Sequence, residues 1–165
     1  MDSATTNRDT SKAPERFKSM RGQTLLEFAL VFPLFIMLVC GILDFGNLLY
    51  SQMTVQNALR EAGRYAVTGQ CSTPPSGCLT DSKGNTLSRV GSIIQIASQM
   101  APGFDFSSMS ISSGGVANNP GGPGATVILS VSPSVQLLTP IVSSYVGKNG
   151  KYTFTASVTF KNEPF

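Results

Sequence analysis

The sequence predicts an α+β protein with a long N-terminal helix that crosses a membrane, a second helix, and a small antiparallel sheet of about three strands. Three observations lead to this prediction. One long run of residues near the N-terminus carries no charge, helical spacing of apolar residues continues beyond that run, and a two-residue period appears in the last third of the chain. The 165 residues leave room for one modest domain besides the membrane helix.

The apolar run predicts the membrane helix. From Phe28 to Cys40 every residue except Pro33 is apolar, and no charge occurs before Asp44. A spanning helix needs about 20 residues, so we expect the span at 23–45, with Glu27 and Asp44 near its two interfaces. A charge at the bilayer centre costs about 2.5 to 3.5 kcal/mol, far more than at an interface. Pro33 removes a backbone hydrogen bond and should kink this part of the helix.

The basic residues predict the topology. Five of the twelve Lys and Arg residues precede the apolar run, namely Arg8, Lys12, Arg16, Lys18 and Arg21. The positive-inside rule therefore places the N-terminus in the cytoplasm and the chain beyond the span on the other side of the membrane. Residues 23–165 carry seven basic and six acidic residues. Because no basic stripe remains to neutralise phosphates, we do not expect nucleic acid as a partner.

A secretory signal peptide is the alternative, since a basic segment before an apolar core describes one too. The run is longer than a usual signal core, contains Glu27, and has no clean small-residue cleavage site after it. Cys40 could mark a lipoprotein, but the bulky Val39 precedes it. We therefore favour a membrane helix and expect Cys40 to be a buried structural residue.

Helical periodicity continues beyond the span at spacings of three and four residues. The stripe of residues at this spacing, all apolar except Gln52, comprises Phe45, Leu48, Leu49, Gln52, Val55, Leu59, Ala62 and Ala66. Thr68 and Gly69 supply a stop. We expect one helix of about 40 residues, roughly 60 Å long, whose second part, 46–69, is amphipathic and covers the sheet.

The stretch CSTPPSGC follows the helix. Cys71 and Cys78 can close this short loop as a disulfide in an oxidising compartment, which stabilises by roughly 2.5 kcal/mol in the chain-entropy model. A zinc site is the weaker alternative, because two thiolates without histidine leave tetrahedral coordination half built. The chain has no histidine, and we expect neither a metal nor a cofactor.

Residues 70–165 form the predicted extracytoplasmic α+β domain. A helix is expected at about Thr86–Ala101, ended by Pro102 and Gly103. Beyond it apolar residues alternate with polar ones, most clearly in a strand at Lys151–Phe160. The glycine-rich stretch 114–124 lacks the register of a phosphate loop, so we interpret it as a flexible hairpin connection.

These features together resemble the pilin-like proteins of bacteria, and among them the TadE-like family of the tight-adherence (Tad) pilus system. Three segments carry the resemblance: RGQTLLEFALVFP at 21–33, ILDFGNLLYSQMTVQNALREAGRYA at 42–66, and FKNEPF at 160–165. The terminal segment has Lys161 where the family pattern suggests arginine. The resemblance covers the first half of the chain beyond the basic segment well, and the second half only at its last strand.

The resemblance implies a processing and assembly signal. Prepilin peptidase, a membrane aspartyl protease, would cut between Gly22 and Gln23, which makes 1–22 a cytoplasmic leader and Glu27 the fifth residue of the mature chain. In pilin assemblies this glutamate is thought to neutralise the N-terminal amine of a neighbouring subunit. Core Tad pilins often have Tyr after the glutamate and a short chain. Phe28 and the sizeable domain here fit a minor pilin or pseudopilin instead.

The implied partners are prepilin peptidase, other pilin and pseudopilin subunits, the Tad secretion machinery and the inner membrane. The leading prediction is thus a minor pilin or pseudopilin of a Tad-type pilus, acting in pilus assembly and adhesion. An uncleaved single-pass scaffold or binding module of the same apparatus is the alternative. An enzyme is not expected, because no histidine can activate a serine, threonine or cysteine nucleophile.

Overall fold

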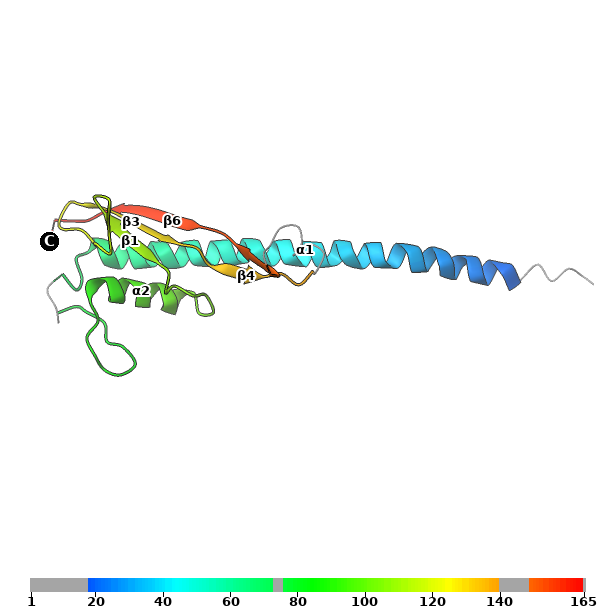
Figure 1. Cartoon of the computed structure of the whole chain (residues 1–165), viewed down its shortest axis with the longest axis horizontal. Coiled ribbons are helices and arrows are strands. Elements are labelled where there is room, and N and C mark those ends of the chain that lie inside the picture. Colours follow the sequence, from blue (N-terminus) through cyan, green and yellow to red (C-terminus); the bar gives the residue numbers. More distant parts are fainter. Residues whose placement is uncertain (1–17, 73–75, 140–148, 165) are drawn as a thin grey trace, which may run out of the picture. The chain divides into compact units, whose positions relative to one another are not determined.

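The computed structural model describes residues 18–72, 76–139 and 149–164, with side chains from Gly22 onward. The predicted leader therefore lies outside the described residues as far as residue 17. The elements, in chain order, are α1 (Lys18–Val67), α2 (Arg89–Met100), β1 (Ser110–Ser113), β2 (Val116–Ala117), β3 (Thr126–Val131), β4 (Ser134–Gln136), β5 (Lys151–Thr153) and β6 (Ala156–Lys161). This confirms the α+β class predicted from the sequence (Figure 1).

The chain divides into two compact units, residues 1–39 and 40–165, and α1 contributes to both. In the first unit the described residues are helical, and Pro33 lies inside α1 without ending it. Among the described residues α1 is the one helix that is long and apolar enough to cross a membrane, judged by length and composition. Cys40 is a free, half-buried cysteine at the start of the second unit.

The second half of α1 supplies one wall of the core of the 40–165 unit. Val55, Leu59, Ala62 and Ala66 are fully buried, as their helical spacing predicts. They pack in one cluster with residues of α2 and of the sheet, which include Ile93, Ala97, Phe106, Ile111, Val127 and Leu129. The start of the predicted stripe differs from the prediction, because Phe45 is 62% exposed and Leu49 is 42% exposed.

Helix α2 begins three residues later than predicted. Thr86 forms an isolated antiparallel bridge with Thr80, and the backbone N–H of Leu87 donates to the Leu79 carbonyl, so both residues are extended. Ser88 then caps the helix, because its hydroxyl accepts a hydrogen bond from the N–H of Gly91 at 3.1 Å. The local β-bridge thus takes precedence over the helical pattern at residues 86–88.

The strands form two antiparallel sheets, one with the order β2-β1-β3-β6 and one that pairs β4 with β5. The predicted strand at Lys151–Phe160 is wrong as a single element, since residues 154 and 155 separate β5 from β6. The pairing nevertheless keeps one register throughout, from Thr126 opposite Lys161 to Gln136 opposite Lys151. Pro133 has no N–H to donate and interrupts the ladder there, while its carbonyl accepts from the N–H of Phe154.

The face of β3 and β4 that the sequence predicts to be apolar is the buried face. Val127, Leu129, Val131, Val135 and Leu137 are all buried, and residues of the opposite parity in β3 and β4 are exposed or half-buried. In β5 and β6, Phe154 and Ala156 are buried, and Tyr152, Val158 and Phe160 pack partly against the core. The alternation read from the sequence thus identifies the dry face of the sheet.

Gly63 allows β6 to approach α1 closely. A Cβ atom built on Gly63 would lie 1.9 Å from Cε2 of Phe160, a separation that no real pair of carbon atoms tolerates. The half-buried Phe160 ring therefore rests directly on the helix backbone. A glycine in a helix interior costs about 1 kcal/mol relative to alanine, and this contact gives a structural reason for it.

We expect Gly63→Ala to destabilise the domain by about 2 kcal/mol, because severe overlap with the Phe160 ring puts the overpacking cost near the upper end of about 1 to 3 kcal/mol and better helix propensity returns about 1 kcal/mol. Denaturant unfolding of the protein in detergent measures the change. In a Phe160→Leu background, where the ring is absent, the same substitution should cost less. Equal stability of Gly63→Ala and wild type would contradict the close-contact role.

Candidate processing and assembly segment

The residues predicted for processing lie near the start of α1. The described part of α1 begins at Lys18, and the Gly22–Gln23 bond lies within the helix. Gly22 and Gln23 are both exposed.

Packing within the described part of the chain does not explain why residue 22 is a glycine. A Cβ atom built there meets nothing within 4 Å, and the same holds for Gly41 and Gly46 farther along α1. This open space contrasts with Gly63. Glycine weakens a helix, and packing among the described residues gives no reason for a glycine at position 22.

Glu27 and Phe28 are exposed on α1. Between residues whose side chains the structure describes, Glu27 takes part in no salt bridge. Phe28 is 62% exposed and stacks on Phe32, one helical turn later, with 5.1 Å between ring centroids. The carboxylate is therefore available to a cation from another chain.

Large apolar side chains around Glu27 are also exposed. Leu25 is 70% exposed, Leu26 71% and Leu30 74%. Exposed apolar surface of this extent marks a membrane or protein contact. Lipid or a neighbouring helix must therefore cover this part of α1.

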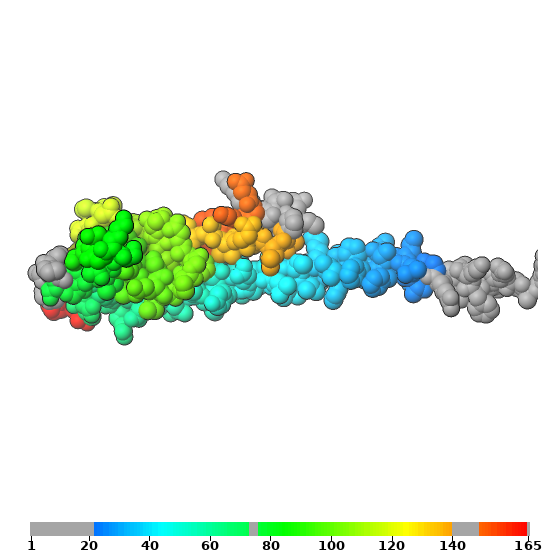
Figure 2. Space-filling model, turned by 90° about the horizontal axis from the view of Figure 1, so that it is seen from below, coloured from blue at the N-terminus to red at the C-terminus, as the bar shows by residue number. Residues whose placement is uncertain are grey.

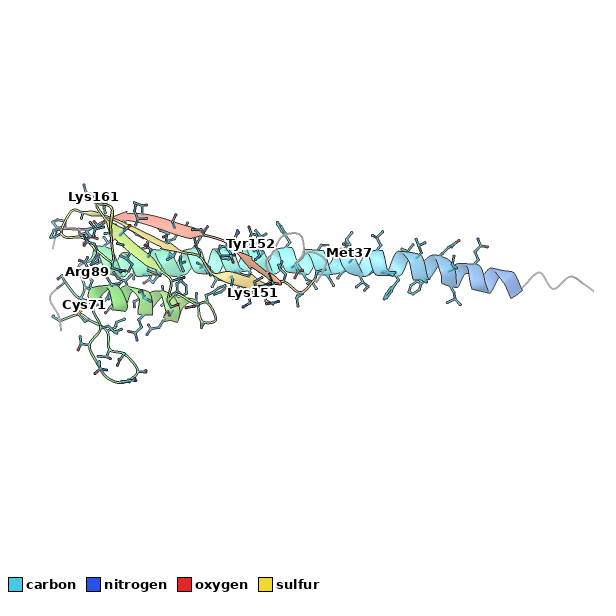
Figure 3. All side chains as sticks on the ribbon, in the orientation of Figure 1. Met37, Cys71, Arg89, Lys151, Tyr152 and Lys161 are labelled. Carbon is cyan, nitrogen blue, oxygen red and sulfur yellow. A yellow bond between two sulfur atoms is a disulfide. The ribbon has the colours of Figure 1, made fainter. Side chains whose placement is uncertain are left out.

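Cys71 and Cys78 form the predicted disulfide, which closes the loop after α1 (Figure 3). Cys71 is buried and adopts a left-handed backbone with φ of 59°, two residues after the left-handed Gly69 that follows the end of the helix. The loop is tied back to α1, because the Tyr65 hydroxyl donates to the Gly77 carbonyl at 2.7 Å. Residues 73–75 of this loop lie outside the described part of the chain.

A groove of about 400 Å³ lies between the end of α1 and α2, open to solvent. Its lining residues are Glu61, Arg64, Tyr65, Thr68, Gln70, Ile96 and Met100. Its two charged side chains pair with each other, with 3.2 Å between Arg64 and Glu61. The groove thus combines a neutral ion pair with two apolar side chains, a surface better suited to contact than to catalysis.

Asp81 and Asp105 stabilise turns of the domain. Asp81 accepts hydrogen bonds from the side chain and backbone of Asn85 and from the N–H of Lys83, and these bonds lower the pKa of its carboxyl. Asp105 accepts from the N–H of Ser107, which lowers its pKa in the same way. Within the described ranges no three His, Cys, Asp or Glu side chains gather closely enough to hold a metal ion.

Asp44 has a role that the sequence did not predict. Its side chain is only 3% exposed, and its two carboxylate oxygens accept hydrogen bonds from the N–H groups of Leu138 at 2.7 Å and Thr139 at 2.9 Å. A carboxylate that accepts two backbone N–H groups forms strong, charge-assisted bonds. Asp44 therefore ties the segment after β4 to α1 rather than simply marking the end of the membrane span.

Arg89 and Asn162 bind the backbone of the glycine-rich loop, a role that the sequence did not predict for either residue. The guanidinium of Arg89 donates to the carbonyls of Gly121 and Ala66, both at 2.8 Å. The amide of the buried Asn162 donates to the carbonyls of Pro120 and Gly122, both at 3.0 Å. Three consecutive carbonyls of the loop predicted to be flexible are thus anchored.

The comparisons with known proteins concern the segment just described. The model of the family described as TadE-like protein matches residues 22–64. Residues 22–64 are TadE-like. This confirms the resemblance expected from the sequence over the part of α1 that carries Gly22, Glu27 and Asp44. No curated protein and no solved structure matches the chain.

The TadE-like segment supports a protein associated with the Tad pilus, and its single apolar helix fits a single-pass membrane protein. Figure 3 shows that Arg89 and Lys161 lie in the other part of the molecule, the α+β domain. The two halves of the candidate site are thus an exposed helix that can meet lipid or other subunits, and a domain fixed internally by Asp44, Arg89, Asn162 and the disulfide.

Proposed function

We propose that the chain is a minor pilin or pseudopilin of a Tad-type pilus, inserted in the bacterial inner membrane and cleaved after Gly22. The observation that carries this proposal is the exposed pair Gly22 and Glu27 at the start of a TadE-like apolar helix. In this proposal 1–22 is the cytoplasmic leader, 23–45 the span, 46–69 its amphipathic continuation and 70–165 the extracytoplasmic domain. The protein acts as a structural subunit and not as an enzyme.

The proposed cleavage requires a backbone that a protease can reach. Gly22 is exposed and offers no side chain to obstruct a protease, and a glycine weakens the helix around it. The basic leader keeps this bond at the cytoplasmic face. Prepilin peptidase is the proposed partner for this step, and the product is a new α-amine on Gln23.

The expected result is a mature chain that begins at Gln23 in cells with an active prepilin peptidase. Mass spectrometry of the purified protein identifies this N-terminus. Gly22→Phe should abolish cleavage because its ring obstructs the bond, whereas Gly41→Ala, in equally open space on the same helix, should be cleaved normally. Recovery of wild-type chains that begin only at Met1 would disprove the processing step.

Glu27 is proposed to receive the α-amine of a neighbouring subunit when the helices pack together in the membrane. An unpaired buried charge costs several kcal/mol, so such a pair sets the register of neighbouring helices more than it adds net stability. Adjacent pilin and pseudopilin subunits are the partners of this contact. The surrounding exposed leucines supply the apolar part of the same interface.

Glu27→Ala should leave membrane insertion intact and reduce pilus assembly strongly. The physical reason is that the neighbouring amine then has no carboxylate in the membrane. Sheared pilus yield, with membrane fractionation as the insertion measure, checks this. Glu163→Ala, which removes an exposed carboxylate from the α+β domain, serves as the control and should assemble normally. A wild-type pilus yield from Glu27→Ala would contradict the assembly role and would mean that Glu27 only marks one interface of the membrane span.

An uncleaved, membrane-anchored scaffold is the second candidate, and two observations favour it. Helix α1 is continuous across the Gly22–Gln23 bond, and the groove between α1 and α2 offers a contact surface for a partner. The Gly22→Phe variant separates the two candidates. Normal pilus function with an uncleaved chain would favour the scaffold, and loss of assembly would favour the cleaved subunit.

A further inference from the structure

The Asp44 clamp fixes the level of one segment of the domain along α1. Asp44 is the first charged residue after the uncharged run 28–43, so it marks one boundary of the apolar part of the helix. Its carboxylate holds the backbone of Leu138 and Thr139 within 2.7 and 2.9 Å. The chain just after β4 therefore lies beside α1, at the level along the helix axis where the apolar part of α1 ends (Figure 1).

The surface at this level is apolar. Leu138 is 68% exposed, although the backbone beside it is firmly bonded and its neighbours Leu137 and Thr139 are buried. On α1, Ile42 is 64% exposed and Phe45 is 62% exposed. In water these side chains would remain without a partner, whereas transfer of a leucine side chain into an apolar medium is favourable.

Polar and aromatic groups suited to lipid headgroups lie next to this apolar level. Lys151 is exposed on β5, opposite Gln136, and the N–H of Leu137 donates to the carbonyl of Gly150 beside it. Tyr50 is 68% exposed and lies six residues beyond Asp44, roughly 9 Å along the helix axis. Tyrosine concentrates at membrane interfaces, and lysine binds the negative surface of a leaflet.

We propose that Leu138, Lys151 and Tyr50 form a contact with the surface of the lipid bilayer, with the Leu138 side chain in the acyl region and Lys151 at the phosphates. The contact goes beyond pilus membership and rests only on membrane insertion of α1. It makes the α+β domain a peripheral membrane domain before assembly. Figure 2 shows the segment around residue 135, in orange, lying against the cyan part of α1.

The absence of tryptophan makes this proposal directly testable, because each introduced indole reports alone. Full-length Leu138→Trp, reconstituted in vesicles of phosphatidylethanolamine and phosphatidylglycerol, should show a blue-shifted emission maximum. Phosphatidylcholine brominated near the glycerol backbone should quench it more strongly than lipid brominated near the chain end. Val116→Trp, at an exposed apolar position of β2, is the matched control and should emit as in water.

A third variant separates failure of this contact from failure of insertion. Phe32→Trp lies inside the apolar run and should be quenched most by lipid brominated near the chain end. If Phe32→Trp is quenched and Leu138→Trp emits like Val116→Trp, the surface contact is wrong and the membrane helix stands. If Phe32→Trp escapes quenching, insertion fails, and the proposed contact and the proposed pilin role fail with it.

Discussion

Replacing Asp44 by alanine is expected to release the segment after β4 from α1 and to destabilise the domain by about 3 to 5 kcal/mol. The estimate follows from two hydrogen bonds to a charged acceptor, each worth about 1.5 to 3 kcal/mol. The N–H of Thr139 would be left without water as an alternative acceptor, since Thr139 is only 6% exposed. The loss of stability should be largest at the end of the domain that lies beside Asp44.

Amide hydrogen exchange checks this prediction residue by residue. In Asp44→Ala the amides of Leu138 and Thr139 should lose protection, and denaturant unfolding should shift to lower concentration. Asp44→Asn keeps one carbonyl acceptor but loses the charge, so it should fall between wild type and alanine. Unchanged protection of both amides in Asp44→Ala would show that the clamp contributes nothing.

Replacing Arg89 by methionine is expected to cost about 2 to 4 kcal/mol, the second large effect. Two charge-assisted bonds are lost, one to the end of α1 at Ala66 and one to the glycine-rich loop at Gly121. Burial lowers the pKa of the Arg89 guanidinium, yet an arginine stays protonated in proteins, so the bonds remain charged at all ordinary pH values. Methionine keeps the apolar stem and removes only the donors.

Arg89→Lys provides a sharper comparison, because a single ammonium cannot reproduce the planar fork that reaches two carbonyls at once. It should recover less than half of the lost stability. Thermal unfolding of the three proteins measures the series, and Lys83→Met, at an exposed turn position, should change little. A lysine variant as stable as wild type would refute the two-carbonyl role of Arg89.

Much of the fold could be predicted from periodicity. The stop of α1 at Thr68-Gly69, the buried parity of Val127 to Leu137 and the Cys71–Cys78 pair all follow from local patterns of two, three or four residues. The periodic patterns show which side chains avoid water, and this tendency depends on the residue type alone and not on distant partners. Gly22 and Glu27 could be singled out because the resemblance to TadE-like proteins points to them, and their proposed roles depend on other proteins and not on the fold.

The missed features depend on partners distant in sequence. Asp44 looks like a boundary charge until Leu138 is placed beside it, and Asn162 looks like a strand end until the carbonyls of 120 and 122 are known. The break between β5 and β6 depends on Pro133 in the opposite strand. No local pattern carries such information, because the acceptors and donors are backbone groups that every residue shares.

The last carbonyl groups at the C-terminal end of α1 accept hydrogen bonds from residues that come much later in the chain. The carbonyl of Val67 accepts from the N–H of Glu163, and that of Ala66 accepts from Arg89. In the proposed topology, residues around 163 leave the cytoplasm after the helix does. The bonds from Glu163 and Arg89 then form only once these residues have crossed the membrane, so the domain closes after translocation and not during it.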